Sequence, residues 1–164
     1  MLSKILKKSD CATCRFCCSF RRQSLWETPI FDAKTKNSLE KKFPNAKFRS
    51  VGKSSFTIDL LNLYKTDDEK EEVPCPFLDL KSGCVLCEQE KPFDCKIWPL
   101  RVMKTLDLEK KFIVLTPTCP SINKIPFLNL ENFVKSELAQ KIWDYANEHP
   151  DIVKDLQKDF PIIC

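Results

Sequence analysis

Glycine is almost absent from this 164-residue chain, which contains only Gly52 and Gly83. Loops that hold phosphate need glycine where the backbone approaches the ligand closely, as in the Gly-x-Gly-x-x-Gly and Walker-type motifs. Neither motif occurs in this sequence. The composition therefore argues against a self-contained nucleotide-binding or S-adenosylmethionine-binding fold of the Rossmann type.

Histidine is scarce as well, because His149 is the only one. The common catalytic zinc sites use two or three histidines, so this chain cannot build them. His149 directly precedes Pro150 at the end of a helical pattern. This position predicts a helix-capping or surface role for His149 rather than a metal ligand.

Long hydrophobic runs are also missing. No apolar stretch approaches the roughly 20 residues that a membrane span needs. Lysines interrupt the apolar residues at positions 1–8, so these do not form the hydrophobic region of a signal peptide. We therefore expect a protein of the reducing cytoplasm that has no membrane partner.

Cysteine, in contrast, is abundant: the chain has ten, and four of them form the motif Cys11-x-x-Cys14-x-x-Cys17-Cys18. A Cys-x-x-Cys step lets two thiolates point from one tight turn at a common ion or cluster. The alternative is a disulfide framework, which is typical of short secreted chains. We expect Cys164 to be a spare thiol. The predicted metal ligands are Cys11, Cys14, Cys17, Cys18, Cys75, Cys84, Cys87, Cys95 and Cys119.

The spacing favours an iron–sulfur cluster of the 4Fe–4S type. Three closely spaced thiolates followed by a remote Cys-Pro are typical of such a cluster, and Cys75-Pro76 and Cys119-Pro120 both fit the remote position. Zinc remains the alternative. It commonly takes two cysteines of one knuckle plus a distant pair, and Cys84-x-x-Cys87 is a suitable knuckle.

The adjacent pair Cys17-Cys18 suggests two neighbouring metal centres. Adjacent side chains usually diverge, so one four-coordinate ion is not expected to bind both thiols. We expect Cys17 to join Cys11 and Cys14 at one centre, while Cys18 turns toward the thiols of residues 75–119. One thiol of this second group would complete the first centre.

The order of these motifs resembles the YkgJ-type cysteine-cluster family, which is described as a zinc- or iron-chelating domain. The resemblance covers about residues 11–120 of the printed sequence. It is carried by the N-terminal motif, Cys75-Pro76-Phe77-Leu78, Cys84, Lys91-Pro92-x-x-Cys95-Lys96-x-Trp98-Pro99 and Cys119-Pro120. The resemblance implies that the metal-binding thiols are Cys11, Cys14, Cys17, Cys18, Cys75, Cys84, Cys95 and Cys119.

The chain departs from the family pattern at four positions. Lys91 and Lys96 stand where the family favours arginine, Trp98 replaces a smaller aromatic residue, and Cys87 falls where tyrosine is usual. Cys87 is therefore either a substitute or an additional ligand. Flagellin lysine methylases carry a related motif, and this analogy keeps open an enzyme that modifies a protein or peptide.

The hydrophobic pattern predicts an α+β fold with cysteine-rich loops around the metal. We expect one domain, residues 1–164, with the family-like core at 11–120 and a helical part at 129–160. Short hairpins are expected over residues 47–63, 77–87 and 100–116, the last turning at Glu109-Lys110. Helices are expected over residues 32–43, 130–145 and 151–160.

Charge and function complete the expectations. The formal charge of +4 counts every cysteine as neutral, whereas metal-bound cysteines are thiolates. Arg15, Arg21 and Arg22 are expected to offset that charge, and the acidic residues at 67–72 are expected to form a solvated loop. Lysines dispersed among acidic residues predict no nucleic-acid partner. No serine, lysine or carboxylate lies in a recognisable catalytic motif. We therefore favour a metal-binding protein that serves in redox chemistry, iron handling or support of a partner enzyme.

Overall fold

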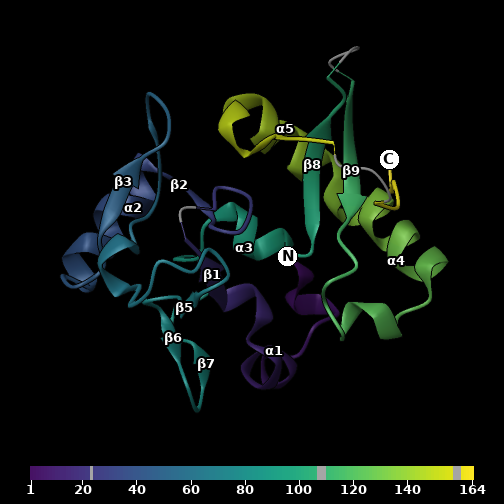
Figure 1. Ribbon diagram of the computed structural model, residues 1–164. Helices are drawn as coiled ribbons and strands as arrows, with labels where there is room; N and C mark the ends of the chain where they lie inside the picture. Colours follow the sequence, from purple (N-terminus) through teal and green to yellow (C-terminus); the bar gives the residue numbers. More distant parts are fainter. Residues whose placement is uncertain (23, 107–109, 157–159) are drawn as a thin grey trace. The chain divides into compact units, whose positions relative to one another are not determined.

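The computed structural model describes residues 1–22, 24–106, 110–156 and 160–164 (Figure 1). The chain divides into two compact units, which we describe separately. The cysteine-rich unit is Lys7–Lys96, and the helical unit combines Met1–Leu6 with Ile97–Cys164. Helices and small sheets occur together, which confirms the α+β class. The single domain expected from the sequence stays a prediction.

The cysteine-rich unit is built from short helices and three small sheets. Its sheets have the strand orders β1-β5, β2-β4-β3 and β6-β7, and every pairing in them is antiparallel. The elements are α1 (Lys8–Cys14), η2 (Phe16–Cys18), β1 (Ser19–Arg21), β2 (Ile30–Asp32), α2 (Ala33–Lys42), β3 (Phe48–Ser50), β4 (Ser55–Ile58), η3 (Leu61–Leu63), β5 (Glu72–Pro74), β6 (Leu78–Asp79), β7 (Gly83–Cys84) and α3 (Phe93–Ile97).

Local signals explain α2 and the hairpin that follows it. The Asp32 carboxylate accepts a hydrogen bond from the Thr35 amide at 2.8 Å, which caps the start of the helix. The helix ends at Phe43, which precedes Pro44. The expected helix at 32–43 and the hairpins at 47–63 and 77–87 are therefore confirmed.

An aromatic core lies beneath these elements. Phe31 and Phe77 are fully buried, and their rings meet Phe48 and Phe43 edge to face, with centroids 5.1 and 5.2 Å apart. Such edge-to-face pairs stabilise a core beyond the area they bury. Half-buried Cys75 and Cys84 pack against the same cluster, so the core supports the thiol-bearing segments directly.

The helical unit is organised around the hairpin of β8 (Leu100–Lys104) and β9 (Lys111–Leu115). This pairing confirms the hairpin expected at 100–116, although residue 109 of its expected turn lies outside the described residues. The other elements are η1 (Leu2–Lys4), η4 (Ile122–Lys124), α4 (Phe127–Phe133), the π-helical turn η5 (Val134–Leu138), α5 (Ala139–Glu148), η6 (Pro150–Ile152) and β10 (Lys154–Asp155). The α4–η5–α5 run confirms the helix expected at 130–145.

The helix expected at 151–160 is wrong. The chain makes one 3-10 turn at Pro150–Ile152 and then forms β10, which pairs in parallel with β8. The Leu156 amide donates to the Lys104 carbonyl at 2.8 Å, so the sheet rather than a helix satisfies this backbone. Residues 157–159 of the expected helix lie outside the described residues.

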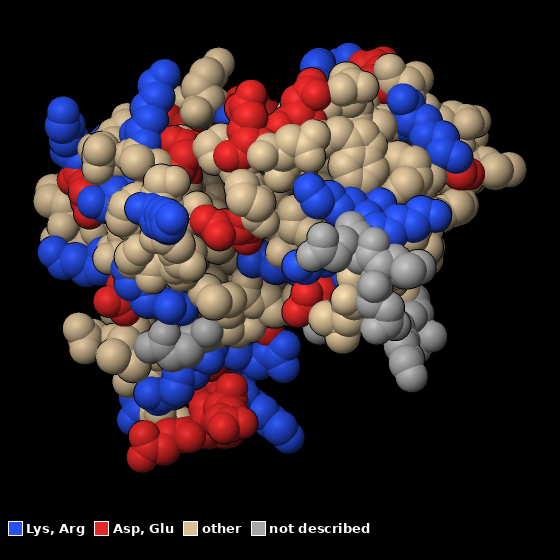
Figure 2. All heavy atoms as spheres, turned by 90° about the horizontal axis from the view of Figure 1, so that it is seen from above, with Lys and Arg blue, Asp and Glu red and all other residues tan. Residues whose placement is uncertain are grey.

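Two surface properties bear on partners. Among the described residues, no helix has the length and apolar character needed to cross a bilayer. In Figure 2, basic and acidic side chains lie next to one another over much of the visible face.

Candidate metal centre

The cysteine-rich unit contains all the predicted ligands except Cys119. The expectation that cysteines sit on loops is wrong for several of them, because Cys11 and Cys14 belong to α1, Cys84 to β7 and Cys95 to α3. Regular backbone therefore positions much of the thiol set. The cysteines from Cys14 to Cys164 are all free thiols.

A two-stranded ladder brings the N-terminal motif to Cys75. Strand β1 begins directly after Cys18 and pairs with β5, which ends directly before Cys75. The pairing sets Ser19 opposite Pro74, and the Cys75 amide donates to the Cys18 carbonyl at 2.8 Å. Two cysteines that are distant in the sequence thus become backbone neighbours.

The next hairpin brings Cys84 to the same place. After Cys75 the chain turns, with the Leu78 amide donating to the Cys75 carbonyl at 2.9 Å. Strand β6 then pairs with β7 so that Leu78 lies opposite Cys84. Figure 1 shows β6 and β7 as a narrow hairpin beyond β5. Cys75 therefore lies just before the β6–β7 hairpin, and Cys84 lies at its end.

Helix α1 packs against this hairpin through its smallest residues. A Cβ atom added at Gly83 would lie 3.0 Å from the Cβ atom of Ala12, closer than side chains normally approach. Gly83 also has a φ of +79°, which favours glycine. Because Ala12 follows Cys11 and Gly83 precedes Cys84, this contact brings the thiol-bearing helix and strand together.

The thiols influence one another electrostatically. Burial raises the pKa of Cys75 to about 12, and the negative charges of Cys84 and Cys17 contribute to the rise. A side-chain hydrogen bond with Cys18, followed by burial, raises the pKa of Cys17. The backbone pairing described above, and the packing of Cys75 and Cys84 on one hydrophobic cluster, place these segments in one region.

Cys95 joins this group from α3. The residue as a whole is exposed, but its thiol is surrounded by protein atoms. This burial is the main cause that raises the pKa of Cys95 well above the usual range, and the charges of Cys75 and Cys17 are the next causes. The Asp94 carboxylate, which is 4% exposed, accepts a hydrogen bond from the Ile30 amide at 3.0 Å. This bond anchors α3 to β2 and fixes the segment that carries Cys95.

The thiol set fits a soft metal by its chemistry, because clustered cysteines prefer zinc or iron–sulfur clusters. The thiols, however, lie farther apart than the ligands of a single metal ion would. Within the described ranges, which include every cysteine, no three Cys, His, Asp or Glu side chains form a group that could hold one metal ion. An ion bound at this place would require the thiols to move closer together.

Cys87 is engaged differently from the other thiols. Its amide donates to one oxygen of the Glu90 carboxylate at 3.0 Å, and the other oxygen accepts from the Lys42 ammonium at 2.5 Å. The Lys42 hydrogen bond and the bonds from Cys87 lower the pKa of Glu90 to about 2. Cys87 therefore lies in an exposed polar cluster of its own.

Cys119 and Cys164 belong to the helical unit. The Cys119 carbonyl accepts from the Asn123 amide at 3.0 Å, in the turn that leads into η4. The Cys164 carbonyl accepts from the Ile113 amide at 2.6 Å, and burial raises the pKa of the Cys164 thiol. His149 ends α5 and its ring lies 4.2 Å from that of Tyr145, as expected for a helix-capping residue.

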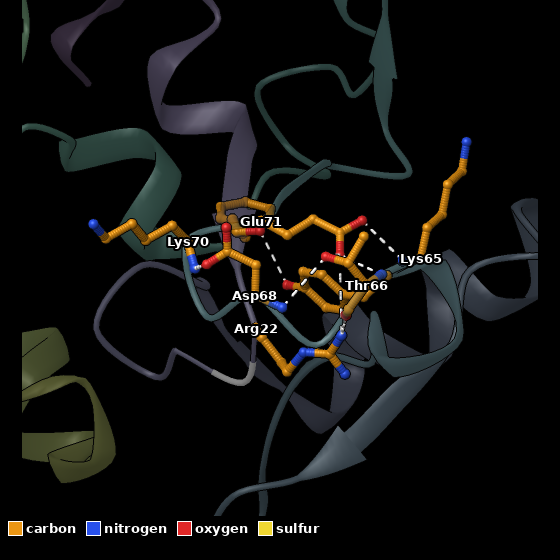
Figure 3. A network of polar contacts seen from close by, with 8 residues as sticks. Arg22, Lys65, Thr66, Asp68, Lys70 and Glu71 are labelled. Carbon is orange, nitrogen blue, oxygen red and sulfur yellow. Dashed lines mark hydrogen bonds and ion pairs between the residues drawn. The ribbon is translucent and has the colours of Figure 1, made fainter.

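The arginines make contacts with other parts of the protein, and their expected compensation of thiolate charge stays a prediction. Arg21 pairs with the Glu27 carboxylate, and Arg15 donates to two backbone carbonyls. Arg22 stacks on the Tyr64 ring at 4.8 Å and donates to the Thr66 carbonyl (Figure 3). These contacts bind segments of the protein to one another.

Glu71 is a residue whose role the sequence did not reveal. Residues 67–70 are exposed and lie outside any helix or strand, which confirms the expected solvated loop. The contacts of Glu71 were not expected: its carboxylate accepts from the amides of Lys65 and Thr66, both at 2.8 Å (Figure 3). The Arg22 guanidinium lies 4.0 Å from the same carboxylate. Because β1 ends directly before Arg22 and β5 begins directly after Glu71, this network supports the ladder that joins Cys18 to Cys75.

No family model, no curated protein and no solved structure matches this chain.

Proposed function

We propose that this chain is a cysteine-ligated metal-binding protein that carries an iron–sulfur centre of the 4Fe–4S type. The proposal rests on one observation: cysteines from four separate segments gather in a single unit. These segments carry Cys17 with Cys18, Cys75, Cys84 and Cys95. A hydrophobic core alone would not require several small thiols at one place, whereas a soft metal would.

Iron–sulfur is favoured over zinc by the spacing of the N-terminal motif, which offers three thiolates within one short segment. When bound, such a cluster would supply one-electron redox chemistry or a rigid cross-link between segments. We accordingly propose a role in redox chemistry, iron handling or support of a partner enzyme in the cytoplasm. The likeness to the YkgJ-type family is part of the same proposal.

The protein chain itself would contribute three things to the centre. The β1–β5 ladder and the β6–β7 hairpin would hold the ligands, and the aromatic core beneath Cys75 and Cys84 would limit access of water. A thiol ligates metal as a thiolate and must first lose its proton. Metal binding would therefore release protons.

Anaerobic purification of the full chain tests the proposal. We expect a brown protein that contains iron and acid-labile sulfide, with an absorption band near roughly 400 nm that bleaches on reduction. Cys75→Ser should lose the colour, while Cys164→Ser, in the other unit, should keep it. A colourless protein that contains zinc without sulfide would support the structural zinc alternative, and a protein without metal would refute both.

A further inference from the structure

Arg15 has an unusual backbone conformation at the centre of the cysteine motif. It follows Cys14, ends α1, and has a φ of +56°, the left-handed region that non-glycine residues rarely occupy. Such a conformation costs free energy and persists when surrounding contacts hold it in place. Any residue with a side chain would incur that cost. We therefore looked to the side-chain contacts of Arg15 for the interactions that offset it.

The Arg15 guanidinium joins two elements. Its Nε atom donates to the Ala12 carbonyl at 3.0 Å, near the end of α1, and its Nη2 atom donates to the Leu80 carbonyl at the tip of the β6–β7 hairpin. The side chain is half-buried between them. The planar guanidinium can donate to both carbonyls at once because its donors are held in a rigid fork.

The hairpin tip is shaped to receive this contact. The Asp79 carboxylate accepts from the amides of Lys81 and Ser82, at 2.9 and 2.6 Å, and so closes the turn around Leu80. Gly83 completes the turn with its positive φ. These bonds lower the pKa of Asp79, and the nearby positive charge of Arg15 lowers it further. The acceptor of Arg15 therefore lies in a rigid turn beside a negative charge.

We propose that Arg15 is a positioning residue that holds the thiols of the N-terminal motif beside Cys84. Helix α1 carries Cys11 and Cys14, and β7 carries Cys84. The guanidinium, together with the close approach of Ala12 to Gly83, therefore sets the distance between these two parts of the thiol set. The consequence for metal binding rests on the proposed function. The contact itself, and its effect on access to Cys84, do not depend on that function.

Two variants separate the backbone role of Arg15 from its side-chain role. Arg15→Gly adopts the left-handed conformation without cost but removes the guanidinium. Arg15→Lys keeps the positive charge on a single ammonium group that lacks the fork. Arg21→Gln is the matched control, because it removes a nearby arginine that pairs with Glu27 and does not involve the hairpin.

The first readout needs no metal. Reduced, metal-free full-length protein is treated with iodoacetamide, and labelling of half-buried Cys84 is followed by mass spectrometry. Loss of a charge-assisted hydrogen bond in Arg15→Gly should speed this labelling roughly tenfold. Arg15→Lys should give a smaller increase, and Arg21→Gln should label like the wild type.

The second readout is the rate at which a chelator removes iron, which should rise in Arg15→Gly. Unchanged Cys84 labelling in Arg15→Gly would overturn the proposal, and so would an equal increase in Arg21→Gln. If Arg15→Gly does not fold, the rate of Cys84 labelling in Arg15→Lys is compared with the wild type instead, and an unchanged rate overturns the proposal. If the wild type holds no metal, the proposed function fails, and the labelling result alone decides the role of Arg15.

Discussion

The amide of Cys75 donates a hydrogen bond to the carbonyl of Cys18 over 2.8 Å, at the end of the β1–β5 ladder. The two cysteines belong to motifs that lie far apart in the sequence. Backbone pairing, rather than a loop wrapped around an ion, therefore sets their separation. If both thiols bind the proposed metal centre, part of its geometry would exist before metal binds, which would reduce the entropy that binding must overcome.

Replacement of single thiols tests the ligand set. We expect Cys14→Ser and Cys17→Ser to abolish metal incorporation or reduce it sharply, because the serine hydroxyl is a poor ligand for soft metals. Iron, zinc and sulfide contents measured after anaerobic purification check this expectation. Cys164→Ser serves as the control and should have no measurable effect. Full cluster content in both N-terminal variants would show that the motif is not a site.

Metal removal should destabilise the cysteine-rich unit. Metal bound to a folded site, but not to the unfolded chain, contributes its binding free energy to folding. Calorimetry of matched samples with and without metal should show the melting temperature falling by many degrees when metal is lost. The metal-free variant Cys17→Ser should show no further fall when chelator is added. Equal melting temperatures for metal-bound and metal-free wild type would contradict a folding role for the metal.

Local signals made parts of this fold predictable. The Asp32 cap and the proline after Phe43 determine a helix from adjacent residues alone, and the prediction of that helix is confirmed. The ladder between Ser19–Arg21 and Glu72–Pro74 is different. Its strands have three residues each, too few for a periodic pattern to be recognised, and their pairing depends on contacts distant in the sequence.

The same distinction applies to the candidate site. The cysteine spacing predicts metal ligands, because chelation is the chemistry that requires such spacing, and that role stays a prediction. It did not reveal Arg15 or Glu71, whose roles depend on carbonyl and amide groups of other segments. A hydrogen bond to a distant backbone group leaves no mark on composition or periodicity. The exposed loop at 67–70 was therefore predictable from its composition, whereas the hydrogen bonds that Glu71 accepts were not.

The Glu71 network predicts how stability depends on pH. Hydrogen bonds from Lys65 and Thr66 hold the pKa of Glu71 below its ordinary value of 4.5. A lowered carboxyl pKa stabilises the folded state above the unfolded value, and this stabilisation is lost as pH falls through the folded value. Glu71→Gln should therefore lower the melting temperature by a few degrees at pH 7, and the difference from the wild type should shrink below pH 4.5. Glu69→Gln, an exposed neighbour, should behave like the wild type at both pH values.

Gly83→Ala tests the contact between α1 and β7. The substitution forces a side chain into a φ of +79° and sets its Cβ atom 3.0 Å from the Cβ atom of Ala12. We expect the free energy of unfolding, measured with denaturant, to fall by about 1–3 kcal/mol. In an Ala12→Gly background the Cβ–Cβ contact is removed, while the backbone strain and the contact with the Cα atom of residue 12 at 3.1 Å stay. The same substitution should therefore cost somewhat less there, with a coupling of about 0.5 kcal/mol. Equal costs in both backgrounds would mean that the Ala12 Cβ atom contributes nothing to the cost of Gly83→Ala.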